Sequence, residues 1–412
     1  MMEISTTAQS AVNPLAPENA PDPYPAYARL REAGPLHKVL IRPGLEAWLV
    51  TRYQEAREVL CDGRMRVSPD ATSEQVREAI SAGPPEETFN LAGPHLLSTD
   101  PPEHTRLRRI ISHALYPKGL ASLREPVQAA ARSLAREIVR RGGGELMADY
   151  AVPLTVTAAC ELLGVAPEHR PMFVRWGVAM AREELADHAT YHQCTEELGG
   201  YLIPLAMAKR SQPGDDVLTA LAAAMGEGLL SISELIGLMF QLFFAGHETS
   251  ACLIGVGMVL LLEHPDQLTL LRDKPELISS AVEEILRYDG PSKVPTWRFP
   301  AEDVEIAGQR ISAGEPVLPL LGCVARDPAQ FTDADRFDIT SGRTANLVFG
   351  AGTHRCAGWA IGKMEAEIGI MTLIEQAPEL RLAVPAGQLA WRNKNIMMRA
   401  PVELPVTCHE RS

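Results

Sequence analysis

The chain has 412 residues, of which 46% are hydrophobic, 22% charged and 5% aromatic. This apolar share is typical of a folded globular protein and excludes disorder for most of the chain. Asp and Glu outnumber Lys and Arg by 52 to 39, which gives a net charge of −13 and argues against nucleic-acid binding. The seven cysteines are scattered, so a disulfide framework or a four-cysteine zinc site is not expected. No signal peptide is visible in the first 21 residues, and we expect a cytoplasmic protein.

In chain order, residues 1–22 are rich in Ala, Pro, Asn and Ser and predict a flexible tail. No repeat or linker divides the remainder, so residues 23–412 are expected to form a single domain, mainly α with a smaller β-rich part. The predicted helices are 26–33, 53–60, 104–114, 126–141, 155–163 and 184–210, and the predicted strands are 46–51, 304–311, 316–321 and short strands from 380 onward. Residues 70–94 are polar and rich in Pro and Gly, which predicts a loop.

Residues 235–262 form the longest apolar stretch and predict a helix of roughly 42 Å at 1.5 Å per residue. A membrane-spanning helix has the same length and apolarity. The middle of the stretch carries His247, Glu248 and Thr249, however, and the rest of the chain is acidic and polar. We therefore expect the central helix of a large core, because such a helix is apolar on all sides.

The polar group inside this helix needs a reason, since a buried carboxylate without partners costs several kcal/mol. Ala245 and Gly246 remove side-chain bulk beside it and leave space for a small ligand, and Thr249 can bond back to the carbonyl of Ala245 and bend the helix. The plain alternative is a kink with a solvated Glu248. Gln241 shares a helix face with Ala245 and is either a substrate contact or a core side chain bonded to a backbone group.

Residues 346–358 are the most informative stretch. Gly350 and Gly352 allow a tight loop, and good helix formers follow Cys356. This places Cys356 at a helix N-terminus, where free N–H groups favour a thiolate. A lone buried cysteine is often inert packing. A dinucleotide-binding loop does not fit these glycines, because Arg355 stands where its third glycine belongs.

Residues 349–358 read Phe-Gly-x-Gly-x-His-x-Cys-x-Gly and resemble the haem-binding loop of cytochrome P450, in its soluble bacterial form. Residues 245–249 are similar to the oxygen-activating motif of that family, and residues 100–108 resemble the helix that crosses the haem edge. The pairs Glu284 with Arg287 and Arg336 with Phe337 match two further motifs in the expected order. Four positions depart from the usual residues of bacterial members: Ala325, Asn346, Ala357 and Lys363.

The resemblance implies the fold of that family, a triangular prism with haem b between the long central helix and the cysteine-loop helix. It implies that Cys356 ligates the iron and that Phe349 shields the sulfur. The other implied cofactor-binding residues are His104, Arg108, Arg298 and His354 at the propionates, with Gly350 and Gly358. The implied catalytic group is Ala245, Gly246, Glu248 and Thr249, of which the last two would relay protons. Glu284, Arg287 and Arg336 would form a buried network that holds the cysteine loop.

The resemblance also implies a monooxygenase that uses O2 to hydroxylate a mid-sized apolar secondary metabolite such as a macrolide or polyketide. The chain has no flavin or iron–sulfur motif, so ferredoxin and a reductase would deliver electrons that come ultimately from NAD(P)H. The alternatives are epoxidation or oxidative ring coupling on the same haem, and a haem-binding scaffold or sensor without turnover.

A local basic cluster would dock an acidic ferredoxin, or is simply a solvated helix face; its members are Arg106, Arg108, Arg109, Lys118 and Arg124. We expect a monomer without a nucleic-acid or membrane partner. Substrate contacts are expected in residues 70–97 and 167–213, and specifically at Leu96, Leu97, Gln241, Phe244, Val294 and Thr296.

Overall fold

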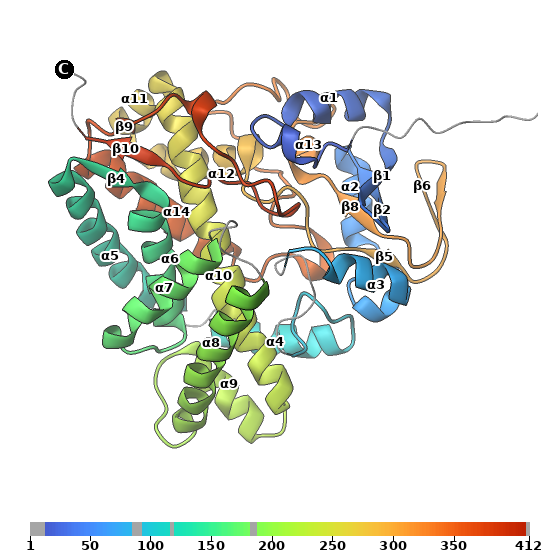
Figure 1. The fold of residues 1–412 in the computed structure, drawn as a ribbon, viewed down its shortest axis with the longest axis horizontal. Helices are drawn as coiled ribbons and strands as arrows, with labels where there is room; N and C mark the ends of the chain where they lie inside the picture. The colour runs from blue at the N-terminus through green and yellow to red at the C-terminus, as the bar shows by residue number, and fades with distance from the viewer. Residues whose placement is uncertain (1–12, 85–92, 116–118, 182–187, 409–412) are drawn as a thin grey trace, which may run out of the picture.

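A computed structural model describes residues 13–84, 93–115, 119–181 and 188–408, and helices dominate it (Figure 1). The helices are α1 (Tyr24–Ala33), α2 (Tyr53–Cys61), α3 (Glu74–Ser81), α4 (Glu103–Leu115), α5 (Gly119–Arg141), α6 (Val152–Leu162), α7 (Arg170–Ala181), α8 (His188–Lys209), α9 (Val217–Gly226), α10 (Ile232–Glu263), α11 (Pro265–Asp273), α12 (Ile278–Asp289), α13 (Leu321–Val324) and α14 (Trp359–Gln376).

The strands are short and form four small sheets. They are β1 (Leu36–Arg42), β2 (Leu45–Val50), β3 (Met65–Arg66), β4 (Gly143–Glu145), β5 (Phe299–Pro300), β6 (Val304–Ile306), β7 (Gln309–Ile311), β8 (Val317–Pro319), β9 (Arg381–Leu382) and β10 (Pro405–Thr407). The sheet orders are β1-β2-β8, β4-β10-β9, β3-β5 and β6-β7. The first sheet lies with α1, α2 and α3 on one side of the molecule, and most helices lie on the other (Figure 1).

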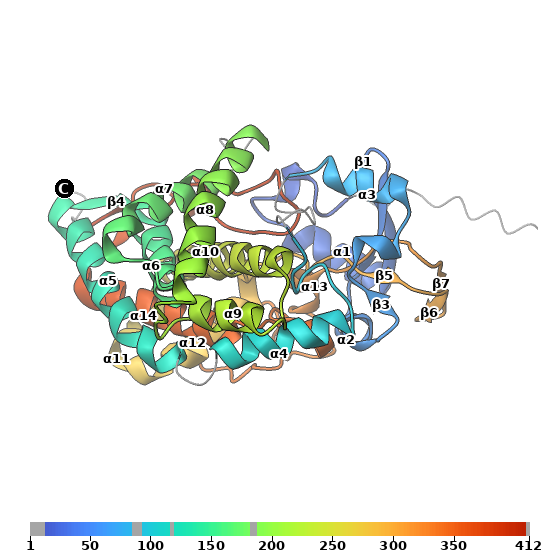
Figure 2. The ribbon, with the colours of Figure 1, turned by 90° about the horizontal axis from the view of Figure 1, so that it is seen from below.

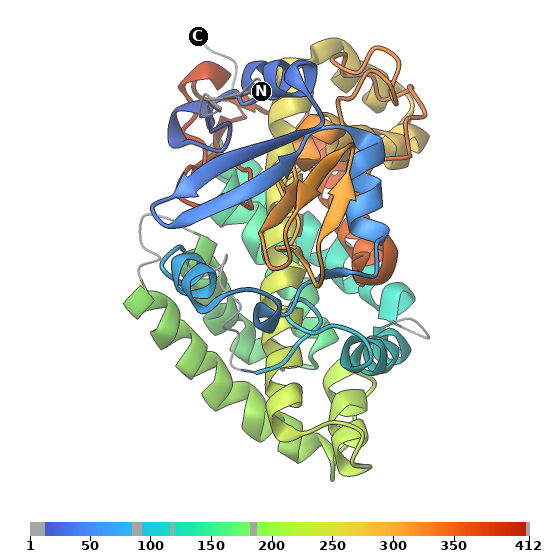
Figure 3. The same ribbon diagram turned by 90° about the vertical axis from the view of Figure 1, so that its right-hand side faces the viewer.

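The helix α10 runs through the centre of the molecule, where Figure 3 shows it between the elements of both sides. A capping box of Ser231 and Glu234 begins it, and Pro265 lies two residues after its last residue, Glu263. It packs against α6, α12 and α14, and Figure 2 shows it from below, among these helices. By length and composition it passes as a membrane span, but 72% of its most apolar window is buried inside the protein. The prediction of a central core helix is confirmed.

Three expectations about local structure differ from the structure. The predicted loop 70–94 contains the helix α3, which Ser73 caps by accepting from Val76 N–H and which Ile80 anchors in the core; residues 85–92 lie outside the described residues. The single predicted strand 304–311 is the hairpin β6-β7, because Ala307 and Gly308 both turn with positive φ, 49° and 77°. Part of the predicted tail is ordered, since Leu15 is buried in the core.

A polar cluster joins the beginning, the middle and the end of the described chain. The Tyr24 hydroxyl of α1 donates to Asp289 Oδ1 over 2.5 Å, and Arg399 Nε donates to the same oxygen over 2.5 Å. Arg399 also donates to the carbonyl of Ala20. Asp289 ends α12, just before the stretch 291–298 that forms one wall of the cavity described next.

Candidate active site

A deep cavity lies between α10 and the segment 349–358, with about 1500 Å³ of empty volume including its mouth. Ala245, Gly246 and Thr249 line one side of it, and Phe349 and Cys356 line the other. A Cβ placed on Gly246 or on Gly358 would meet nothing within 4 Å. The two motifs that the sequence singled out therefore face each other across one open space.

The shape of the cysteine segment depends on its glycines. Gly350 and Gly352 have φ values of 72° and 68°, in the left-handed region that favours glycine. A Cβ on Gly352 would lie 2.7 Å from the carbonyl oxygen of Leu60, so this loop also sits directly on the end of α2. The Cys356 N–H donates to the Phe349 carbonyl over 2.8 Å and closes the loop. Cys356 is thereby held just before α14 with its side chain exposed to the cavity.

The environment of the Cys356 sulfur contains opposing influences. Burial raises the pKa of the thiol above its ordinary value, while a hydrogen bond from the Gly358 backbone and the charges of Arg108 and Arg355 lower it. The Gly358 N–H and the two arginines favour the thiolate. A metal ion bound to the sulfur would lower the pKa of the thiol further, because a coordinating thiol loses its proton.

Four basic side chains converge on the edge of the same cavity: His104, Arg108, Arg298 and His354. The rings of His104 and His354 lie 4.1 Å apart between centroids. Burial, with the charge of Arg108, lowers the pKa of His104 to about 4, and burial with the charge of Arg298 lowers that of His354 to about 3. Both imidazoles are therefore neutral at pH 7.

Two observations at this basic group are compatible with a bound anion. Among the described residues neither ring nitrogen of His104 has a hydrogen-bond partner, although both are buried. The Arg298 guanidinium is 3% exposed and donates to the carbonyl and the hydroxyl of Thr296, and its burial lowers its pKa to about 10. A buried cation and an orphaned ring call for carboxylates. A thiol ligand, this cradle and the open glycine face together fit the haem that the sequence resemblance implies.

On α10, Thr249 Oγ1 donates to the Ala245 carbonyl over 2.9 Å, as predicted. Glu248 is not among the described residues that line the cavity: its Oε1 accepts from Arg392 Nη1 over 2.7 Å, and the Arg392 side chain is 4% exposed. His247 is buried and its Nδ1 lies 2.7 Å from the Phe243 carbonyl oxygen. Thr249 therefore faces the cavity while its neighbour Glu248 faces a buried cation.

The predicted substrate contacts divide into two groups. Leu96, Leu97, Gln241 and Thr296 line the cavity. The structure does not place Phe244 or Val294 in the described lining, because Phe244 packs on Phe240 and Phe243 and Val294 is buried in a core cluster with Trp297. Gln241 Oε1 accepts from the Leu96 N–H over 2.9 Å, so the backbone-bonded alternative for this side chain is realised.

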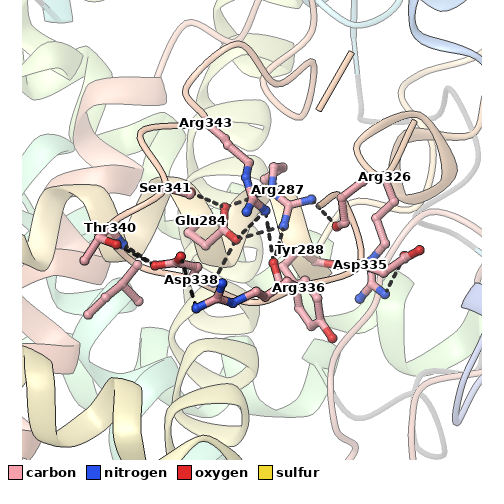
Figure 4. A network of polar contacts seen from close by, with 12 residues as sticks. Glu284, Arg287, Tyr288, Arg326, Asp335, Arg336, Asp338, Thr340, Ser341 and Arg343 are labelled. Atoms are coloured by element: carbon pink, nitrogen blue, oxygen red, sulfur yellow. Dashed lines mark hydrogen bonds and ion pairs between the residues drawn. The ribbon is translucent and has the colours of Figure 1, made fainter. Parts of the chain in front are cut away.

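The structural network around Glu284 is present, with one correction (Figure 4). Arg287 Nε and Nη2 each donate to a Glu284 oxygen over 2.8 Å. The side chain of Arg287 is 0% exposed and that of Glu284 is 2% exposed. The side chain of Arg336, expected as the third member, is 67% exposed and lies near Asp338. Arg336 contributes only its carbonyl oxygen, which accepts from Arg287 and Arg343. Arg343 Nη1, 3.3 Å from Glu284 Oε1, supplies the third guanidinium.

Two of the departures from the family pattern share one partner in the structure. Asn346 Nδ2 donates to one oxygen of Glu283 over 3.1 Å, and Lys363 Nζ donates to the other over 2.5 Å. Asn346 lies three residues before the segment 349–358 and Lys363 lies in α14, so Glu283 of α12 bonds a residue on each side of Cys356.

Three residues of the site had not been singled out from the sequence: Arg343, Arg392 and Glu365. Glu365 of α14 lines the cavity, is 1% exposed, and burial raises its pKa to about 8. The signal for it was present, because it is a carboxylate inside an apolar helix, like Glu248. The other two lie in irregular segments without a readable pattern.

The predicted basic cluster is divided by the structure. Arg106 pairs with Glu234 and donates to the Leu229 carbonyl. Arg108 lines the cavity and donates to the Arg355 carbonyl. Arg109, with Arg66 and Arg106, borders a shallow surface hollow, and Lys118 lies outside the described residues.

Comparisons with known proteins show which family the chain resembles. The family model described as "Cytochrome P450" matches residues 271–377. The chain is 39% identical to cytochrome P450 monooxygenase PikC of Streptomyces venezuelae over 396 residues, 95% of this chain and 92% of the relative. It is 37% identical to mycinamicin IV hydroxylase/epoxidase of Micromonospora griseorubida over 387 residues, 92% and 94% of the two chains.

Among solved structures, the myxobacterial cytochrome P450 CYP267B1 in complex with myristic acid matches with a TM-score of 0.87 at 36% identity, over 96% of this chain and 98% of the other. The predicted fold class is thereby confirmed. Since the likeness runs through nearly the whole chain and the motif residues meet at one cavity, the chain belongs to the cytochrome P450 family and is a haem monooxygenase.

Proposed function

We propose that this enzyme inserts one oxygen atom of O2 into a C–H bond of a mid-sized apolar secondary metabolite such as a macrolide or polyketide. The observation that carries the proposal is the cavity in which Cys356 and Thr249 face each other beneath a mostly apolar wall. The named activities of the relatives, a monooxygenase and a mycinamicin hydroxylase/epoxidase, support the reaction and the substrate class.

The bound haem supplies the redox chemistry of O2 activation at its iron. The residues of this chain hold it and shape its surroundings. Cys356 provides the sulfur, and Gly358 N–H and Arg108 favour its charged form. Arg298, His104 and His354 at the edge of the cavity would hold the carboxylates of the cofactor by donating hydrogen bonds to them.

Protons reach the cavity from α10. Thr249 carries a hydroxyl at the cavity surface, bonded to the Ala245 carbonyl, and can pass a proton between water and a substrate-side acceptor. Glu248, 17% exposed and held by Arg392, is the carboxylate next to it. To relay a proton to Thr249, Glu248 must leave Arg392 and take up a proton from water, which it then passes on. This ion pair therefore sets the access of Glu248 to the cavity.

The substrate is recognised mainly by shape. Leu96, Leu97, Leu242 and Leu253 line the cavity, and such a surface binds an apolar skeleton by the hydrophobic effect. The electrons come from NAD(P)H through a reductase and a ferredoxin. The acidic ferredoxin would dock on the arginine-lined surface around Arg109. We further propose that the enzyme acts as a cytoplasmic monomer in secondary metabolism. Epoxidation is the second candidate reaction, because a relative is named hydroxylase/epoxidase.

The first experiment is the absorbance spectrum of the reduced protein with carbon monoxide, beside the Cys356→Ser variant. A strongly red-shifted Soret band that the variant lacks supports thiolate ligation, and a band at the position of imidazole ligation contradicts it. Macrolides and polyketides are then screened by spin-state shift, and turnover products are identified by mass spectrometry. A Thr249→Ala variant should still consume reductant but yield peroxide; unchanged coupling of reductant to product would refute the role of Thr249.

A further inference from the structure

Residues 93–98 form a segment, here called the roof segment, that lies along the first half of α10. A Cβ built on Gly93 would lie 2.1 Å from the Ser233 carbonyl oxygen, and one built on Gly237 would lie 2.4 Å from the Pro94 carbonyl oxygen. Real Cβ atoms do not approach this closely. Glycine at both positions is therefore what lets the backbone of the roof segment touch α10.

The next contact along α10 is a hydrogen bond. Gln241 lies four residues after Gly237, so the two share one helix face, and Gln241 Oε1 accepts from the Leu96 N–H over 2.9 Å. Leu96 is 4% exposed, and its buried N–H would otherwise lack a partner. Ala245 and Thr249 continue the same face toward the centre of the cavity.

The roof segment is also held by hydrogen bonds of its own. Within the roof segment, Leu97 N–H bonds the ring of His95, and Ser98 N–H bonds the His95 carbonyl.

The roof segment is also anchored where it ends. The Asp100 carboxylate accepts from the N–H groups of Val67 and Ser68 over 3.0 and 3.1 Å. Between these anchors the side chains of Leu96 and Leu97 are presented to the cavity. Their position follows the backbone, and the backbone position depends on Gln241.

We propose that Gln241 is a specificity-determining positioning residue: by holding the Leu96 N–H it fixes Leu96 and Leu97 over the cavity and so sets the size of substrate that the cavity admits. This inference rests on the proposed function, since it concerns the same cavity. Gly237 distinguishes this positioning role from a direct contact between Gln241 and the substrate. Gly237 is not among the described cavity-lining residues, yet a side chain at Gly237 must displace the roof segment.

The test uses two variants with one control. Gln241→Met keeps the length of the side chain but removes the acceptor, Gln241→Glu keeps an acceptor oxygen, and Gly237→Ala pushes the Pro94 carbonyl away from α10. The probes are imidazole, phenylimidazole and clotrimazole, three haem-iron ligands of increasing size, whose dissociation constants are read from the shift of the Soret band. This measurement needs neither turnover nor the natural substrate.

We expect Gln241→Met and Gly237→Ala to change the affinity ratio of clotrimazole to imidazole by about tenfold in the same direction, with Gln241→Glu like the wild type. Amide hydrogen exchange of residues 93–98 should accelerate by about tenfold in the same two variants. If Gln241→Met changes the affinity ratio and Gly237→Ala does not, Gln241 contacts the ligand directly and the proposal is overturned. Unchanged amide hydrogen exchange of residues 93–98 in both variants would also overturn it. A protein without a thiolate Soret band would refute the proposed function instead, and the exchange result would still decide the role of Gln241.

Discussion

The buried pair of Glu284 and Arg287 gives the sharpest stability prediction. Arg287 is fully buried, and besides its two bonds to Glu284 it donates to the carbonyls of Ala325, Ala334 and Arg336. Glu284→Gln leaves the guanidinium in place without its countercharge and turns an amide N–H₂ toward it. Removing one partner of a buried ion pair costs about 3–5 kcal/mol, because the remaining charge stays desolvated.

The identity of the third arginine is tested by a matched pair of variants. Arg343→Ala removes a guanidinium that is 13% exposed and bonds both Glu284 and the Arg336 carbonyl, which should cost about 1–3 kcal/mol. Arg336→Ala removes a side chain that is 67% exposed and should change stability by less than about 0.5 kcal/mol.

The assay is urea unfolding of the three variants and the wild type, followed by circular dichroism, with the midpoint and slope fitted separately. Haem retention is measured in parallel from the Soret absorbance, since the network lies behind the cysteine segment. A larger loss for Arg336→Ala than for Arg343→Ala would refute the assignment. If Glu284→Gln does not fold, the two arginine variants still decide the question.

Three further results are expected. Burial raises the pKa of Glu365 from an ordinary 4.5 to about 8 in the folded protein. Between these two pH values Glu365 is charged only in the unfolded chain, so the free energy of unfolding falls as pH rises, by about 3 kcal/mol at pH 7. Glu365→Gln should abolish this fall in unfolding curves measured at several pH values, and the same pH dependence in the variant and the wild type would contradict the burial argument. Gly352→Ala should weaken haem retention, because its φ is positive and its Cβ would collide with the Leu60 carbonyl, whereas Gly342→Ala, with open space around its Cβ and the same sign of φ, controls for backbone strain alone. Glu283→Gln should weaken the bonds to Asn346 and Lys363 and speed the transfer of haem to apomyoglobin. An unchanged rate of haem transfer would show that these two bonds do not contribute to haem retention.

The parts of the site that the sequence predicted are those whose geometry is local. Thr249 reaches the carbonyl of Ala245 because a helix places residue i beside i−4. The pairing of Glu284 with Arg287 follows from the same geometry at a spacing of three residues. The central position of α10 was also predictable, because a helix apolar on all sides needs a core around it.

The parts that failed depend on choices between distant partners. Arg336 and Arg343 lie in one irregular segment, and only the path of that segment decides which side chain reaches Glu284. Arg392 lies 144 residues from Glu248 in the chain, and no periodicity links such positions. The helix α3 was missed for a different reason: it is short and stands in a polar stretch, although the Ser73 cap and the apolar Val76 and Ile80 were readable.

The cluster of Tyr24, Asp289 and Arg399 has a consequence for how the protein is made. Tyr24 of α1 is synthesised before the residues that line the cavity, but Arg399, which shares the Asp289 carboxylate with it, is synthesised after them. Domains whose contacts join distant parts of the chain cannot complete them until the later part exists. The stretch after Asp289 forms one wall of the cavity, so the contacts behind this wall are complete only once Arg399 has been synthesised. A chain truncated before Arg399 should therefore hold haem less tightly than one that contains it.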